Sequence, residues 1–99
     1  MITLADIAKF DYGTREALVF QNLINDCLNT IRRFKDGITH DVLLEALRED
    51  EKVRPNDSKH YAQTESFWIM WVTNACYVLE KLGYIERFRE GVTIVYKPL

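Results

Sequence analysis

The stretch from Ala75 to Tyr96 reads ACYVLEKLG, YIERFREG and VTIVY in three successive pieces. Leu79 and Leu82 are three residues apart, as on one side of a helix, and Gly83 follows where a left-handed residue ends many helices. The next two pieces are β-prone runs separated by Glu90-Gly91, a pattern typical of a hairpin. The stretch therefore predicts a helix that ends on glycine and leads directly into a two-stranded ribbon.

The length and the net charge of the chain limit which classes of protein it can belong to. The chain has 99 residues, which is enough for one domain with a hydrophobic core that needs neither disulfides nor metal. No apolar run has the length of a membrane span, and the first residues lack the order of a signal peptide, so we expect a cytoplasmic protein, or one in the host cytoplasm if it is viral. The formal net charge of −2 counts against a dedicated nucleic-acid binder, because such proteins draw affinity from a basic excess.

The cysteines and histidines favour structural roles. Cys27 and Cys76 lie in helical apolar patterns, which predicts buried free thiols; a disulfide between the two helices is the alternative. Their spacing to His40 and His60 fits no zinc motif, and neither histidine has a partner spaced for a catalytic relay. The chain also lacks a glycine-rich phosphate loop. We therefore expect a non-enzymatic domain without a metal or a cofactor.

The whole pattern predicts a single α+β domain with three or four helices and a C-terminal antiparallel β-hairpin. Thr3 and Asp6 have the spacing of a capping box, and Thr39 can cap the helix that follows it. The predicted helices are Leu4–Phe10, Arg15–Phe34 with Thr14 as its N-cap, a helix after Thr39 that contains Val42, Leu43, Ala46 and Leu47, and Glu65–Leu82. The predicted strands are a short one at Ile38, then Ile85–Arg89 and Val92–Tyr96. The domain divides into an N-terminal extension (1–13), a long first helix (14–36) and a helix, polar loop, helix and ribbon (37–98).

The segment Gly37 to Pro98 resembles the winged helix-turn-helix superfamily. The resemblance is carried by Ile38-Thr39, Leu43-Leu44 and Leu47, followed by LEKLGYIER at Leu79–Arg87. In that family the third helix enters the major groove of DNA, and the ribbon, or wing, contacts the flanking backbone. The resemblance therefore implies a winged-helix-like fold and DNA binding.

A helical wheel divides the helix 65–82 into two sides. The side expected in the core holds Trp68, Trp71, Val72, Ala75, Val78, Leu79 and Leu82, with Ile69 and Cys76 at its edge. Serine, threonine, asparagine and tyrosine can contact base edges and phosphates, and on the opposite side these residues are Ser66, Thr73, Asn74 and Tyr77. Phe67 and Met70 lie beside them and are costly to leave in water, which predicts contact with a protein surface.

Two groups of basic residues stand out in the sequence, and the first of them is a candidate for phosphate contact. Arg87 and Arg89 share strand parity and should point the same way, and Lys59 precedes the third helix. We expect these three to contact the DNA backbone; in the alternative, they are a solvated surface with Arg87 paired to Glu86 or Glu90. A second group, formed by Arg32, Arg33 and Lys35, is explained by the favourable interaction of cations with a helix C-terminus.

Two functions follow as expectations. The first is a small, dimeric protein that binds double-stranded DNA and regulates transcription in a prokaryote or its virus, with the homodimer built from the first helix, the long helix or both. The N-terminal segment either folds back over Leu18 and Val19 or crosses to the second subunit. The alternative is a protein-interaction module, such as a viral or host accessory protein that docks on a host protein without binding DNA. The low basic content and the stripe of Phe67, Met70 and Tyr77 favour this alternative.

Overall fold

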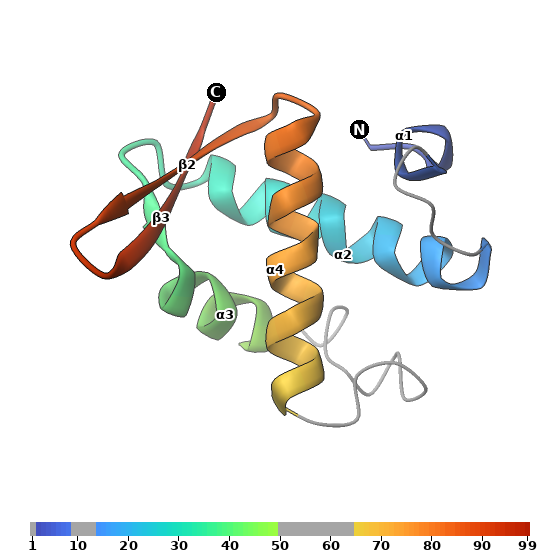
Figure 1. Ribbon diagram of the computed structural model, residues 1–99, viewed down its shortest axis with the longest axis horizontal. Coiled ribbons are helices and arrows are strands. Elements are labelled where there is room, and N and C mark those ends of the chain that lie inside the picture. The colour runs from blue at the N-terminus through green and yellow to red at the C-terminus, as the bar shows by residue number, and fades with distance from the viewer. Residues whose placement is uncertain (1, 9–13, 50–64) are drawn as a thin grey trace.

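The computed structural model describes residues 2–8, 14–49 and 65–99 (Figure 1). These residues form four helices and an open sheet of three antiparallel strands in the order β1-β3-β2, which confirms the expected α+β class. In chain order the elements are α1 (Leu4–Ala8), α2 (Thr14–Arg32), β1 (Ile38–Thr39), α3 (His40–Glu49), α4 (Glu65–Lys81), β2 (Ile85–Glu90) and β3 (Thr93–Pro98). The polar loop predicted between α3 and α4 lies outside the described residues.

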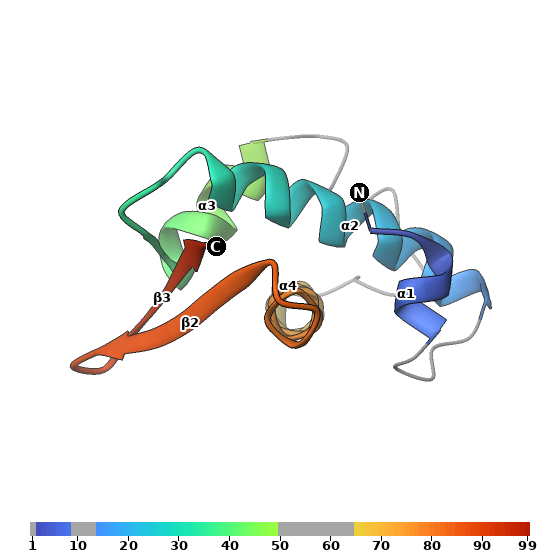
Figure 2. The ribbon, with the colours of Figure 1, turned by 90° about the horizontal axis from the view of Figure 1, so that it is seen from above.

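The helices form two layers. In Figure 1, α4 crosses α2, with α1 at one end of the molecule and the sheet at the other. Figure 2 shows α4 on one side, α2 and α3 on the other, and the ribbon of β2 and β3 projecting beside them. None of the helices in the described segments combines the length and the apolarity needed to cross a membrane.

A single hydrophobic cluster joins these elements. It draws side chains from every helix and every strand, and it also contains Cys27 and Cys76, which are buried and free, as predicted. The largest fully buried side chains are Tyr96, Ile2, Ile7, Ile24, Leu28, Ile31, Leu43, Leu47, Leu79, Ile85 and Val72.

The end of α4 is set by a local glycine motif. Gly83 has a φ of 84°, a left-handed conformation that side chains rarely adopt. The amide of Tyr84 donates to the carbonyl of Leu79 at 3.0 Å, and the amide of Gly83 donates to that of Glu80 at 3.1 Å. This pair of bonds is the Schellman motif, which satisfies carbonyls at a helix end. The predicted helix stop is therefore confirmed, and the chain turns at once into β2.

The three strands pair as the hairpin pattern requires. The short strand predicted at Ile38 is confirmed, since Ile38 lies opposite Tyr96 in the β1–β3 pair. The second ribbon strand begins one residue later than predicted, because Val92 belongs to the turn and is 96% exposed. The strand itself starts at Thr93, opposite Glu90.

The N-terminal segment folds back onto the long helix of the same chain. The amide of Thr3 donates to Asp6 Oδ2 at 3.0 Å, and that of Asp6 donates to Thr3 Oγ1 at 3.3 Å, which confirms the capping box. Ile2 and Ile7 are fully buried, and the side chain of Asn25 bonds both the amide and the carbonyl of Ile2. The fold-back alternative is therefore the arrangement observed, although the side chains of residues 18 and 19 lie outside the described part of the chain.

Two sequence expectations need correction. The long helix ends at Arg32, two residues before the predicted Phe34, because the last amides bond carbonyls three residues back in a tightened turn. Ile69, placed at the edge of the core-facing stripe, is 38% exposed, whereas Cys76 at the same edge is only 1% exposed. Which side of a stripe is covered depends on where the neighbouring helix crosses it, and the wheel does not contain that information.

Candidate nucleic-acid interface

The outer face of α4 carries several of the predicted site residues. Met70 and Tyr77 are 46% and 45% exposed, Thr73 is exposed and Asn74 is half-buried. The polar side of the helical wheel is thus on the surface, as predicted. Because Val72 on the opposite side is fully buried, α4 is anchored by one face and presents the other.

Three predicted site residues cannot be placed on this face. Ser66 and Phe67 belong to the first turn of α4, but their side chains lie outside the described residues, and Lys59 does so entirely. Of the two histidines, His40 is the first residue of α3, whereas His60 lies outside the described residues.

The polar groups on α4 are already partly engaged. Thr73 Oγ1 donates to the carbonyl of Ile69 at 2.8 Å, which leaves the lone pairs of that hydroxyl to accept from a ligand. The ammonium nitrogen of Lys81 lies 5.4 Å from the centre of the Tyr77 ring, within the range of a cation–π contact. The helix face therefore carries a positive charge beside an exposed aromatic ring.

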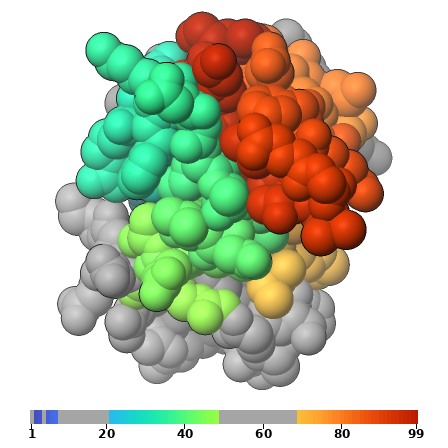
Figure 3. All heavy atoms as spheres, turned by 90° about the vertical axis from the view of Figure 1, so that its left-hand side faces the viewer, coloured from blue at the N-terminus to red at the C-terminus, as the bar shows by residue number. Residues whose placement is uncertain are grey.

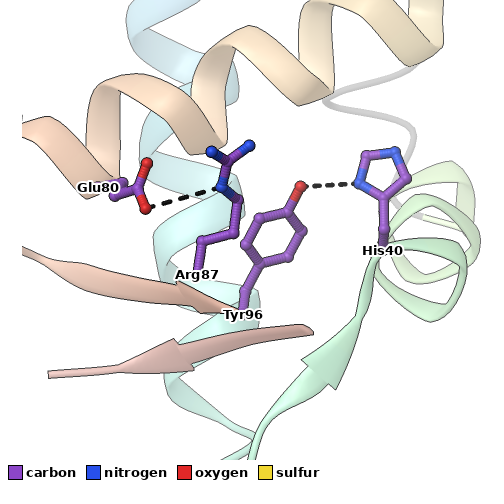
Figure 4. Close-up of polar contacts among 4 residues, drawn as sticks. All are labelled: His40, Glu80, Arg87 and Tyr96. Carbon is purple, nitrogen blue, oxygen red and sulfur yellow. Dashed lines mark hydrogen bonds and ion pairs between the residues drawn. The ribbon is translucent and has the colours of Figure 1, made fainter. Parts of the chain in front are cut away.

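The ribbon presents its two arginines on one face. Arg87 lies opposite Tyr96 and Arg89 lies opposite Ile94, and directly opposed residues in an antiparallel pair share a face. Arg87 and Arg89 are two residues apart in a strand whose pairing with β3 has no break in register, which confirms the predicted shared face, and both are exposed. Figure 4 shows Arg87 and Tyr96 pointing from the ribbon toward α4.

The partner of Arg87 differs from the expected ones. Arg87 Nε lies 3.6 Å from Glu80 Oε2 on α4, instead of pairing with Glu86 or Glu90. These two glutamates alternate with Arg87 along the strand, so they occupy the other face of the ribbon. The pair with Glu80 is partly exposed and therefore contributes at most about 1 kcal/mol to stability. It also cancels part of the positive charge that Arg87 brings to this surface.

A shallow pocket of about 180 Å³ lies on the ribbon, lined by Arg87, Phe88, Arg89 and Ile94. Small-molecule and cofactor sites are larger, about 300–1,000 Å³. The pocket is therefore a surface indentation beside two guanidinium groups. The two guanidinium groups can donate hydrogen bonds to a single anionic group, such as a phosphate.

A partly buried polar contact joins the ribbon to the helices. Tyr96 Oη and His40 Nδ1 are hydrogen-bonded at 2.9 Å, which joins β3 to the first residue of α3 (Figure 4). Burial raises the pKa of Tyr96 well above its ordinary value, so the phenol stays neutral. A side-chain hydrogen bond with the Cys76 thiol, followed by burial, raises the pKa of Cys27 well above its ordinary value. A thiol whose pKa is raised in this way is a poor nucleophile.

The His40 contact predicts a pH dependence of stability. Burial lowers the pKa of His40 below its ordinary value, and the Asp41 carboxylate opposes this only in part. The unfolded chain, with a histidine pKa of about 6.5, therefore binds the proton more readily than the fold does. The stabilisation is fully present above about pH 6.5 and is lost as pH falls through the lower folded-state pKa. Urea unfolding at pH 7.5 and pH 5.0 should thus show a larger acid loss for the wild type than for His40→Gln. Equal losses in the two proteins would remove this role of His40.

The helical wheel also placed Glu80 and Lys81 on the outer side of α4, but it did not predict their contacts or the exposure of Ile69. Lys81 lies four residues after Tyr77, and this helical spacing alone could have indicated their contact. Ile69 was assigned to the edge of the core but adds apolar surface beside Met70. Glu80 had no sequence signal as a partner of Arg87, because their contact depends on the angle between α4 and the ribbon.

No protein-family model matches the chain, and comparisons with curated proteins and with solved structures found no match either. A function must therefore be inferred from the described residues themselves.

Proposed function

We propose that this chain is a winged-helix DNA-binding domain, in which α4 enters the major groove and the β2–β3 ribbon contacts the flanking backbone. The observation that carries the proposal is the juxtaposition of the exposed α4 face with the ribbon face that bears Arg87 and Arg89 (Figures 1 and 2). A helix for base edges beside a cationic ribbon for phosphates is the geometry by which such domains bind DNA.

The order of the elements supports the same proposal. From α2 onward the chain runs helix, strand, helix, helix, strand, strand, and β1 pairs with β3 of the ribbon. This order is the one implied by the resemblance of Gly37 to Pro98 to the winged helix-turn-helix superfamily. Fold analogy alone is a weak warrant for function, so the surface chemistry is the stronger support.

Each exposed residue has a distinct role in the proposal. Thr73, Asn74 and Tyr77 are the base-edge and phosphate contacts from α4, and Ser66, in the first turn of that helix, is proposed as a further one. Arg89 contacts the backbone directly, because it has no ion-pair partner among the described residues. Arg87 contributes after exchanging Glu80 for a phosphate. Lys59 is a further backbone contact.

The biological form of the proposal is a homodimeric regulator of transcription, acting in the cytoplasm of a prokaryote or of a cell infected by its virus. A two-fold dimer presents two copies of α4 to half-sites about one helical turn apart. Since α1 packs on its own α2, the dimer contact would be made by the outer surfaces of these two helices.

A salt titration of binding to a mixed-sequence duplex tests the proposal. The wild type should bind at low salt, and its affinity should fall steeply as salt rises. The reason is that lysine and arginine side chains bound to phosphates release counterions from DNA, and this release is less favourable at high salt. Arg87→Ala combined with Arg89→Ala should weaken binding on every sequence and reduce the log–log salt slope by about one for each phosphate that is no longer neutralised. Asn74→Ala should instead change the sequence preference.

A charge-matched control is available at the far end of the molecule. Ala5→Glu combined with Asn22→Asp also lowers the net charge by two, at exposed positions on α1 and α2, and it serves as the control once sedimentation shows that it has the same oligomeric state as the wild type. This control should change the salt slope far less than the double arginine variant. Absence of wild-type binding at low salt would remove the proposal, and equal slopes for the two variants would remove the ribbon contact.

A second candidate function is favoured by the apolar part of the same face. Ile69, Met70 and Tyr77 are large, exposed and grouped on α4, and such patches mark protein contacts more often than DNA contacts. Together with the net charge of −2, they favour a protein-interaction module on the same scaffold. This candidate predicts that the duplex does not bind even at low salt, so the same titration separates the two functions.

A further inference from the structure

The exposed positive charge of the described residues is concentrated away from the outer face of α4. Four exposed cations gather where α2 ends and β3 approaches it, and we name them the α2-end cluster: Arg32, Arg33, Lys35 and Lys97. The exposed carboxylates nearest to them in the chain and in the sheet are Asp36 and Glu86. Two carboxylates against four cations leave a local charge of +2, on a chain whose formal charge is −2.

Tertiary contacts bring the members of the cluster together. The pairing of Ile38 with Tyr96, extended by one residue, places Gly37 beside Lys97, so the turn that follows α2 lies against β3. The guanidinium of Arg32 lies 6.0 Å from the centre of the Tyr84 ring, at the entry to β2. Figure 3 shows the end of α2 and the ribbon strands side by side on one face of the molecule.

The helix dipole does not explain the whole cluster. Arg32 is in the last turn of α2, where a cation is stabilised by the helix C-terminus. Lys35 lies beyond the helix, and Lys97 belongs to a strand. Arg33 donates one bond to Thr30 Oγ1 at 3.3 Å, which leaves most of its five N–H donors for another acceptor. Among the described residues, no carboxylate forms an ion pair with any of the four.

The cluster is also separate from the arginine surface of the ribbon. Lys97 lies opposite Glu86 in the β2–β3 pair, whereas Arg87 lies opposite Tyr96. Adjacent residues of a strand point to opposite faces, so Lys97 and Arg87 are on different sides of the sheet. A polyanion bound by the cluster would therefore make contacts that neither α4 nor the ribbon face with Arg87 and Arg89 makes.

We propose that the α2-end cluster is a second, sequence-independent surface for the phosphates of double-stranded DNA. This inference rests on the proposed DNA-binding function and extends its interface to the other side of the sheet. Guanidinium and ammonium groups bind phosphate oxygens through charge-assisted hydrogen bonds, and such contacts supply affinity without reading sequence. The cluster thereby compensates for the weak positive charge of the α4 face, where Glu80 neutralises part of Arg87.

The test compares Arg33→Ala combined with Lys35→Ala against the same control, Ala5→Glu combined with Asn22→Asp. Arg32 is retained because it packs on Tyr84. If both cations contact phosphates, the log–log salt slope should fall by about 2, and the affinity at 100 mM salt should fall by at least roughly tenfold on every sequence. Lys97→Ala, which alters a different element, should reduce the slope by about 1.

The outcomes separate the two proposals. A slope equal to that of the control, in a wild type that binds DNA, overturns the second surface and leaves the α4–ribbon interface intact. A loss confined to particular sequences also overturns it, because phosphate contacts carry no sequence information. Absence of wild-type binding at low salt overturns both. Circular dichroism melts of all variants should coincide, since every substituted position is exposed.

Discussion

Replacing Leu79 with alanine should lower the free energy of unfolding by about 2–5 kcal/mol, the cost typical of truncating a fully buried leucine. Leu79 is fully buried on the inner face of α4, and its carbonyl accepts the bond from Tyr84 that ends the helix. Removing the side chain leaves a cavity between the helices, and the surrounding residues can relax into it only in part. Because domains are stable by only about 5–15 kcal/mol, the variant should unfold at a markedly lower urea concentration.

Val92→Ala is the matched control for this prediction. Val92 also loses methyl groups on truncation, but it is 96% exposed at the tip of the ribbon. Its unfolding free energy should stay within about 0.5 kcal/mol of the wild type. Similar urea midpoints for Leu79→Ala and Val92→Ala would contradict the core position of α4. An unchanged slope of free energy against urea would show that the denatured state is the same in both variants.

Gly37→Ala should destabilise the fold by about 2–4 kcal/mol, from left-handed strain and steric overlap together. Gly37 has a φ of 112°, which disfavours any side chain, and a β-carbon there would lie 2.8 Å from Val95 Cγ1. Val95 is buried and belongs to the central strand of the sheet, so it has little room to move. Thermal or urea unfolding of the variant should measure the loss.

Gly83→Ala separates the two causes. Gly83 also has a left-handed φ, of 84°, but a β-carbon there would meet nothing within 4 Å. This variant should lose only the conformational part, about 1–2 kcal/mol. The steric part at Gly37 should be recovered in a double-mutant cycle with Val95→Ala, as a favourable coupling between the two substitutions. Equal losses for both glycine variants, with no coupling to Val95, would refute the close approach.

The position of Gly37 links this prediction to function. It lies between Lys35 of the α2-end cluster and β1, and its conformation directs the turn toward Lys97. A side chain at Gly37 should therefore disturb the spacing of the cluster as well as the stability of the sheet.

Much of the fold was predictable because its signals are local. The stop at Gly83, the capping box of Thr3 and Asp6, and the cap of α3, where the amide of Val42 donates to Thr39 Oγ1 at 3.3 Å, all follow from short spacings. The candidate site was predictable only in part. The wheel placed Met70, Thr73 and Tyr77 on the surface, since helical period decides which residues share a side.

The amino-acid sequence by itself determined the helices, the ribbon and the shared face of Arg87 and Arg89, because caps, periodicity and strand parity act over a few neighbouring residues. Only the tertiary structure decided the contacts between distant segments. Tyr96 is hydrogen-bonded to His40, 56 residues away in the sequence, and Arg87 forms an ion pair with Glu80 on α4 instead of with a glutamate of its own strand. The turn after α2 lies beside Lys97. These contacts depend on how α4 crosses α2 and how far the ribbon folds back, and both are set by the packing of the common core.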